Sequence, residues 1–202
     1  MPALPDPLTF RCTGCGNCCR ALRVAITASD VARLTVASGR AASELVAWLP
    51  PDEVDMEGEP ESFVELSSGR RLMVLAQARG ACVLLTPEDR CSAYAARPLD
   101  CRAFPFDFER AASASLRDGK ARLALLPLVT AERGEAGALL SCDYASDGEQ
   151  NGLELAELDA WRFRELAAYQ QVVARWNRLA RHRRRLRHPL GSGADFLRFA
   201  LS

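Results

Sequence analysis

Alternating apolar and polar positions mark several strands along this chain. Two of them flank Ser67-Ser68-Gly69-Arg70, a turn sequence that predicts a β-hairpin. A later stretch contains Pro127, which cannot donate a ladder hydrogen bond and so indicates an edge strand or an early end. The predicted strands cover residues 22–26, 63–66, 71–75, 80–85 and 122–129.

Apolar residues spaced three and four apart predict three helices. Thr27 to Asp30 has the spacing of a capping box, and Gly39 closes the helix that follows. A second helix is expected from Ser43 to Leu49, ahead of two prolines. The longest runs from about residue 154 to 185. Its expected buried face consists of Phe163, Leu166, Tyr169, Val173, Trp176 and Ala180.

Charge is balanced over the chain but unevenly distributed along it. The 26 basic and 26 acidic residues give no reason to expect nucleic acid as a partner. Residues 52–65 hold seven acids and no base, which predicts a solvated loop. Residues 175–187 hold seven arginines and no acid; they suit a helix C-terminus, with the acidic loop as counter-charge. Docking on an acidic partner, RNA or anionic lipid is the alternative.

The chain has the features of a soluble protein. No stretch approaches the roughly 20 apolar residues of a membrane span, and the first residues lack the basic and apolar regions of a signal peptide. We therefore expect a cytoplasmic location and no membrane partner. Twenty-five arginines against the single Lys120 indicate a GC-rich bacterial genome.

Cysteine spacing is the most distinctive feature of the chain. Gly14 and Gly16 stand inside a C-x2-C-x2-C-C run and allow a tight loop around one centre. A disulfide framework is the competing interpretation, but the chain is long, lacks a signal peptide, and would strain a bridge between Cys18 and Cys19. The pattern therefore indicates metal binding. All eight cysteines are candidate ligands: Cys12, Cys15, Cys18, Cys19, Cys82, Cys91, Cys101 and Cys142.

A second segment is as distinctive as the cysteine run. It contains Tyr94, Arg97-Pro98, Cys101-Arg102 and Phe104-Pro105. With the opening cysteine run, Ile26–Asp30 and Gly80-x-Cys82, it closely resembles the YkgJ-like cysteine-cluster family over roughly residues 8 to 145. The resemblance implies a zinc- or iron-chelating protein, often with an iron–sulfur cluster, and makes Cys142 the family's late cysteine. One branch resembles flagellin lysine methylases, which are longer, so that activity is not carried over.

Thiolate ligands fit zinc and iron–sulfur clusters and suit hard cations poorly. For a [4Fe–4S] cluster, Cys12, Cys15 and Cys18 would bind three corners, and a distant cysteine the fourth. For zinc, eight thiolates make two four-thiolate sites, and adjacent cysteines in an extended loop would serve different centres. We favour the iron–sulfur cluster and keep zinc as the alternative. The two histidines, His182 and His188, are expected on the surface.

Arginines beside the cysteines bear on either metal. Four thiolates around Zn²⁺ or an oxidised cubane leave a formal charge near −2, which must be offset when buried. Arg97 and Arg102, and also Arg20, are expected to donate hydrogen bonds to sulfur or backbone near the ligands. Tyr94, Phe104 and Phe106 are expected as apolar walls, and Asp30 as a helix cap, while Asp100, Asp107 and Glu109 are candidate acids without a defined role.

These features predict an α+β fold: a small irregular metal-stapled core with a short antiparallel sheet and a long C-terminal helix. Residues 1–150 would form the metal-binding domain and residues 151–202 a helical extension packed on it. The predicted function is metal binding, for electron transfer or for a metal-stabilised interaction with a protein partner. The alternatives are an enzyme that uses the cluster, either an oxidoreductase or a modifying enzyme such as a methylase relative, and a structural zinc protein.

Overall fold

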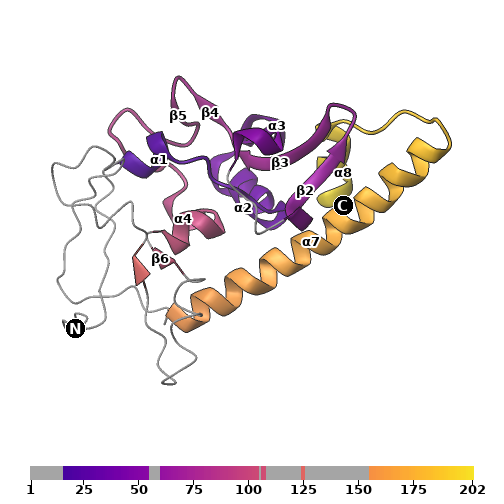
Figure 1. The fold of residues 1–202 in the computed structure, drawn as a ribbon. Helices are drawn as coiled ribbons and strands as arrows, with labels where there is room; N and C mark the ends of the chain where they lie inside the picture. Colours follow the sequence, from indigo (N-terminus) through magenta and orange to yellow (C-terminus); the bar gives the residue numbers. More distant parts are fainter. Residues whose placement is uncertain (1–15, 55–59, 105, 108–123, 126–154) are drawn as a thin grey trace.

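The computed structural model describes residues 16–54, 60–104, 106–107, 124–125 and 155–202 (Figure 1). The helices are α1 Asn17–Ala21, α2 Ala28–Ser38, α3 Ala42–Leu45, α4 Leu99–Ala103, α7 Leu155–Arg185 and α8 Gly193–Ala200, with 3₁₀ turns η1 Pro51–Glu53, η2 Pro60–Ser62 and η3 Tyr94–Ala96. The strands are β1 Val46–Leu49, β2 Phe63–Leu66, β3 Gly69–Leu75, β4 Gln77–Ala78, β5 Ala81–Cys82, β6 Phe106–Asp107 and β7 Ala124–Leu125. The predicted α+β class is confirmed.

An antiparallel sheet in the order β1-β3-β2 forms the centre. The predicted hairpin is present, and its turn is tighter than expected because Leu66 already pairs with Gly69, whose φ is 100°. The predicted strand 22–26 is present only as one bridge, between Ala25 and Val74. Only Ala124–Leu125 of the predicted strand 122–129 is described, and it pairs with Phe106–Asp107.

The second predicted helix, residues 43–49, is wrong in its larger part. The helix α3 ends at Leu45, and Val46–Leu49 continues as strand β1, in which Val46 pairs with Leu75. The spacing of apolar residues is ambiguous over so short a stretch, and pairing with the free edge of β3 determines the outcome.

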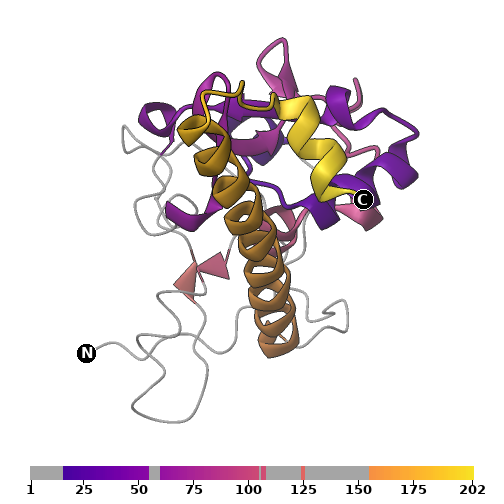
Figure 2. The same ribbon diagram turned by 90° about the vertical axis from the view of Figure 1, so that its right-hand side faces the viewer.

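Helices cover one face of the sheet. In Figure 1, α7 runs diagonally along the sheet, and Figure 2 shows α8 beside it. Side chains alternate along the strands, so one face joins α2, α7 and α8 in the main core. Its sheet residues are Val64, Leu66, Met73 and Leu75, and its helix residues include Val31, Leu34, Val173 and Phe196. The other face holds a smaller cluster around Phe63, Leu72 and Val74.

The start and end of α2 follow the sequence prediction. The hydroxyl of Thr27 accepts a hydrogen bond from the backbone N–H of Asp30, and the Asp30 carboxylate accepts one from the backbone N–H of Thr27. Gly39 ends the helix with φ 68°. This reciprocal capping leaves neither amide without a partner at the N-terminus of α2.

The long helix α7 also protects an edge of the sheet. The Asn177 side chain accepts from the backbone N–H of Glu65 and donates to the carbonyl of Phe63, both at 2.8 Å. The Trp176 indole N–H donates to the carbonyl of Glu65, also at 2.8 Å. Because β2 is an edge strand of its sheet, these side chains occupy backbone groups that another strand would otherwise pair with.

The prediction of which α7 residues are buried is confirmed in the later part of the helix but not at its start. Tyr169, Val173, Trp176 and Ala180 are buried, whereas Phe163 is 72% exposed. One link joins the basic end of α7 to the acidic segment, a 3.1 Å ion pair between Arg184 and Glu65.

Helix α8 was not predicted. Ser192 and Asp195 form a capping box at its start. Its Phe196 is fully buried and meets three rings edge-on: Trp48 at 5.7 Å, Tyr169 at 6.4 Å and Trp176 at 5.5 Å between ring centroids. None of the helices in the described part of the chain combines the length and the apolar character that a membrane span requires.

Candidate metal centre

Gly16 positions the first described thiols. It precedes α1 with φ 72°, and a Cβ placed there would lie 2.8 Å from Nη1 of Arg20 and 3.2 Å from the carbonyl oxygen of Asp89. A larger residue would therefore be strained and would also clash. The short helix that follows carries Cys18 and Cys19, and the backbone N–H of Leu22 bonds to the carbonyl of Cys18 at 3.0 Å. Cys12, Cys15 and Gly14 lie outside the described residues.

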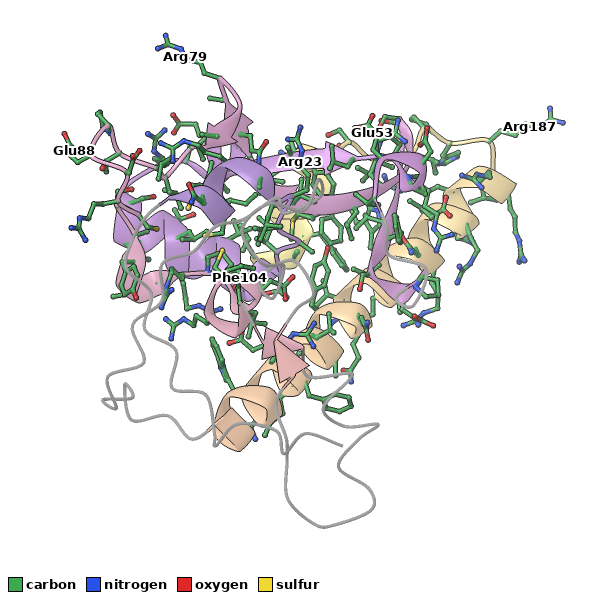
Figure 3. The ribbon with its side chains drawn as sticks, turned by 60° about the vertical axis from the view of Figure 1, so that its left-hand side comes forward. Arg23, Glu53, Arg79, Glu88, Phe104 and Arg187 are labelled. Carbon is green, nitrogen blue, oxygen red and sulfur yellow. The ribbon has the colours of Figure 1, made fainter. Side chains whose placement is uncertain are left out.

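A tight hairpin carries Cys82. Arg79 and Gly80 have φ of 54° and 78°, values that suit a two-residue turn between β4 and β5, and Gln77 pairs with Cys82. Figure 3 shows Arg79 pointing away from the body at the tip of this hairpin. Helix α1 packs against β5, and the Gln77 amide donates to the carbonyl of Leu22 at 2.9 Å. The hairpin and the Cys18 segment are thus fixed to each other.

The chain between Cys82 and Cys91 turns back on itself. The backbone N–H of Leu84 donates to Sγ of Cys82 at 3.4 Å, the kind of contact that stabilises a thiolate ligand. Leu85 forms an antiparallel bridge with Cys91, and the backbone N–H of Ser92 bonds to the carbonyl of Leu84 at 2.9 Å. The strand position of Cys82 and the place of Cys91 just beyond the following turn agree with the sequence prediction.

Helix α4 brings Cys101 to the same region. Pro98 precedes it, and its carbonyl accepts from the backbone N–H of Arg102 at 3.0 Å. The backbone N–H of Leu99 donates to Oδ1 of Asp30 at 3.1 Å, so a fully buried carboxylate fixes the start of α4 against α2. Phe104 follows this helix, and Figure 3 places it far from Arg187 at the other end of the molecule.

Cys18 and Cys19 contact each other through their thiols. The pKa of Cys18 is lowered to about 6, chiefly by a hydrogen bond from the Cys19 thiol and to a smaller extent by the charge of Arg97. The same hydrogen bond, together with burial, raises the pKa of Cys19. The shared hydrogen bond thus favours ionisation of Cys18 and opposes ionisation of Cys19. The two adjacent residues lie on helix α1 and not in the extended loop that the zinc interpretation assumed.

The remaining thiols lie close enough to Cys18 to affect one another. Burial raises the pKa of Cys82, and the charges of Cys91 and Cys18 raise it further, against the effect of the Leu84 N–H. Burial also raises the pKa of Cys101, with added contributions from Cys18, Cys82 and Asp100. Such groups repel one another when ionised, and a bound cation removes that repulsion.

The described cysteines lie near one another but do not form a complete set of metal ligands. Five of the described cysteines form no disulfide and are half-buried: Cys18, Cys19, Cys82, Cys91 and Cys101. Within the described ranges, no three Cys, His, Asp or Glu side chains converge tightly enough to hold a metal ion. Charges affect one another's pKa values over longer distances than a metal–ligand bond. The pKa effects among the thiols are therefore compatible with the absence of a tight ligand group among the described residues. The donor set is soft and fits zinc or iron–sulfur ligation. Cys142 lies outside the described residues.

The predicted arginines contact the backbone of the cysteine-bearing segments. Arg97 lies over the Tyr94 ring at 3.8 Å and donates through Nε to the carbonyl of Tyr94 at 3.1 Å. Arg102 donates through Nε to the carbonyl of Arg97 at 2.9 Å and through Nη2 to the carbonyl of Ala95. Together they hold the loop between Cys91 and Cys101. Their action on a bound metal stays a prediction.

Two further predicted side chains lie at the rim. Arg20 pairs with Asp89, close to Gly16, and Asp100 pairs with Arg162 at 3.5 Å. His182 and His188 are exposed at the far end of α7, as expected. Asp107 and Phe106 belong to β6 but their side chains are outside the description, as is the whole of Glu109.

Asp30 does more than the sequence suggested. Besides capping α2, it holds Leu99 and pairs with Arg33 at 2.5 Å. Arg33 in turn binds Glu165 on α7 through two hydrogen bonds of 2.6 and 2.9 Å. Both Arg33 and Arg102 lie over the ring of Trp161, at 5.0 and 5.2 Å. The capping motif was visible in the sequence, but no local signal marks its connection to α4 and α7.

Comparison with known proteins agrees with this chemistry. No match to the chain was found among curated proteins or among solved structures. The profile of a family described as "CxxCxxCC: Putative zinc- or iron-chelating domain" matches residues 11–120, more than half of the chain. That match includes Gly16 and seven of the eight cysteines, all except Cys142. The chain therefore belongs to the CxxCxxCC family of zinc- or iron-chelating domains.

Proposed function

We propose that this protein binds a [4Fe–4S] cluster and transfers electrons to or from a protein partner. The observation that carries the proposal is the packing of the cysteine-bearing segments: helix α1 lies against β5, which carries Cys82, and the Leu85–Cys91 bridge returns the chain to the same place. The cysteines come from different segments, and a soft metal centre among them accounts for their proximity. Cys12, Cys15 and Cys18 are the proposed ligands of three irons, with the fourth from Cys82, Cys91, Cys101 or Cys142.

Contact between the Cys18 and Cys19 thiols supports one centre here. Two separate four-thiolate zinc sites would require these sulfurs to point toward different metals. Instead, the Cys19 thiol donates to the Cys18 sulfur. In the proposed centre Cys18 is the ligand, since its pKa is already lowered, and Cys19 donates a hydrogen bond to it.

The surroundings of the thiols suit an electron-transfer centre. A cluster of this kind supplies a one-electron couple whose potential depends on hydrogen bonds to sulfur and on exposure to water. The Leu84 N–H donates to Cys82, and Arg97 places positive charge near Cys18. Both groups favour the more negative, reduced state of the centre. The half-buried thiols also keep the centre near the surface, within reach of a partner.

A structural zinc site is the second candidate, and the architecture favours it in one respect. Helix α1, the β4–β5 hairpin and helix α4 consist of elements that are each only two to five residues long. Elements of this size commonly depend on a metal for stability. An enzyme remains the third candidate, in which only three thiolates bind the cluster and one iron is open to substrate.

Several coarser features accompany the proposal. The arginine-rich composition supports an origin in a bacterium, and we extend the proposal to a cytoplasmic location. Residues 1–150 would contain the centre, with residues 151–202 as the helical extension that supports it.

Metal and acid-labile sulfide analysis of protein purified without oxygen tests the proposal directly, together with an absorption spectrum. Equal amounts of iron and sulfide in a brown protein support the cluster. Zinc without sulfide in a colourless protein overturns it in favour of the structural site. A cluster that loses one iron on mild oxidation and regains it on incubation with Fe²⁺ supports the enzyme, because it shows a three-thiolate site.

A further inference from the structure

A small cavity lies between α7, the start of α2 and the start of α4. Its volume is about 60 Å³. Its apolar lining comes from residues such as Ile26, Leu72 and Leu166, and its polar lining includes Asp30, Asp100, Arg162 and Tyr169. An ordered water needs roughly 10–15 Å³ of such space, so the cavity has room for a molecule of a few heavy atoms.

One polar group in the lining lacks a partner. Tyr169 is 4% exposed, and its hydroxyl oxygen is buried without a hydrogen-bond partner in the described part of the chain. Burial raises the pKa of Tyr169, so the group is a neutral hydroxyl that can both donate and accept. A buried hydroxyl left without a partner is unfavourable, so a molecule in the cavity that supplies the missing hydrogen bond would be stabilised there.

The charged groups of the lining lie partly open to solvent. Arg162 and Asp100 form an ion pair at 3.5 Å through Nε of the arginine, with side chains 23% and 41% exposed. This is a long pair that uses a single guanidinium nitrogen. A guanidinium carries five N–H donors, more than this one contact uses. A carboxylate can therefore approach Arg162 while an ammonium approaches Asp100.

Asp30 adds negative charge to the wall of the cavity but does not offer a contact to a ligand. Its Oδ2 accepts from the backbone and hydroxyl of Thr27, and its Oδ1 accepts from Leu99 and Arg33. Both oxygens are therefore engaged within the protein. An anion with no positive group would be repelled by Asp30 and Asp100.

Among charged and apolar ligands, the lining favours one that carries both charges. A simple anion meets two carboxylates, a simple cation meets Arg162, and an apolar molecule leaves the Tyr169 hydroxyl without a partner. We propose that the cavity is a binding site for a small zwitterion, an amino acid of the size of glycine, alanine or serine. Its carboxylate would bind Arg162 and Tyr169, and its ammonium Asp100. The site adjoins Cys101 through Asp100, and the proposal does not rest on the identity of the metal.

Titration calorimetry of the full-length, metal-loaded protein with glycine, alanine and serine tests this site. Acetate and methylamine are the single-charge probes, and metal content is measured in every sample. A ligand this small is expected to bind in the micromolar to millimolar range. The proposal requires at least one amino acid to bind at least about tenfold more tightly than either single-charge probe, a difference of about 1.4 kcal/mol. No binding at millimolar concentrations, or equal binding of acetate, would mean that water fills the cavity and would overturn it.

Three variants separate the site from general effects. Tyr169→Phe keeps the buried ring and removes only the hydroxyl, so it should weaken amino-acid binding about tenfold without lowering thermal stability. Arg162→Gln should weaken it further, because it removes a charge-assisted bond. Arg164→Gln changes an exposed arginine on the same helix and should leave binding unchanged. If Arg164→Gln weakens binding as much as Arg162→Gln does, or Tyr169→Phe has no effect, the assignment is wrong, whatever metal the protein contains.

Discussion

The buried carboxylate of Asp30 accepts a hydrogen bond from the backbone N–H of Leu99 at 3.1 Å, across 69 residues of sequence. This contact joins the helix cap of α2 to the helix that carries Cys101. The same carboxylate pairs with Arg33, which binds Glu165 on α7. One side chain therefore connects the candidate metal centre to the long helix that supports the sheet.

Replacing Asp30 should affect stability and metal retention together. Asp30→Ala removes the α2 cap and leaves the Leu99 amide and the Arg33 guanidinium without their partner. We expect a loss of about 2–4 kcal/mol in the free energy of unfolding. Metal content of the purified protein should fall as well, because α4 loses its attachment. Chemical denaturation and metal analysis of the same preparation measure both effects.

Asp195 offers a matched control for this variant. It occupies the same position in the capping box of α8, again with an arginine three residues later, but its side chain is 41% exposed and its hydrogen bonds go to Ser192 and Arg198 within α8. Asp195→Ala should lower stability slightly and leave metal content unchanged. Equal metal loss in both variants would show that capping alone, and not the link to Leu99, is responsible.

Gly16 and Gly39 form a second matched pair. Both have φ near 70°, but only at Gly16 would an added Cβ meet neighbours within 4 Å. Gly39→Ala should cost about 1–2 kcal/mol from backbone strain alone. Gly16→Ala should cost more and should reduce metal content, because the Cys18 helix must shift. A melting temperature and metal content equal to those of Gly39→Ala would contradict this account.

Replacing Phe196 or Phe163 by alanine should have very different effects on the free energy of unfolding. Phe196 is fully buried among Trp48, Tyr169 and Trp176, so Phe196→Ala should cost about 3–5 kcal/mol. Phe163 is 72% exposed, and Phe163→Ala should change the free energy of unfolding by less than about 0.5 kcal/mol. Urea denaturation of both variants decides this. A large effect at Phe163 would mean that it is covered in solution.

Removing a thiol should release the metal. Cys15→Ser and Cys101→Ser each replace a proposed ligand with a hydroxyl that binds soft metals poorly, so metal content and melting temperature should both fall. Ser92→Ala is the control. It removes only the 3.0 Å bond from the Ser92 hydroxyl to the Leu84 carbonyl and leaves every thiol in place. Full metal content in either serine variant would remove that cysteine from the ligand set.

The start of α8 should show a specific pH dependence. The backbone N–H of Ser192, its hydroxyl and Arg198 lower the pKa of Asp195 to about 2. The unfolded value is about 3.9, so the carboxylate stabilises the folded protein above that pH. The contribution is lost as the pH falls through about 2. The difference in unfolding free energy between the wild type and Asp195→Asn should therefore shrink between pH 5 and pH 2. A constant difference over this range would contradict the assigned pKa.

Local signals in the sequence predicted much of this fold. The capping box at Thr27, the hairpin turn and the periodicity of α7 depend on residues close in sequence, and each is present. Strand β1 could not be predicted, because its conformation depends on the edge of β3. Phe163 follows the helical period but lies on a part of α7 that leaves it exposed.

The candidate site likewise combines features that depend on residues close in sequence with features that depend on distant residues. Residue type and spacing predicted the thiols as ligands, which stays a prediction, and the structure places Cys18, Cys82 and Cys91 near enough to Cys101 to raise its pKa. The contacts that hold them there join residues that are distant in sequence, such as Asp30 with Leu99 and Gln77 with Leu22. Such pairs carry no periodic or compositional signal.

The packing of Phe196 has a consequence for synthesis of the chain. Residues 193–200 leave the ribosome after every other element of the main core, yet they supply the ring on which Trp48, Tyr169 and Trp176 converge. A nascent chain that lacks them exposes these aromatic side chains to water and to chaperones. Folding of this core is therefore completed after translation of the region, when the cysteine-bearing segments have long been available to metal.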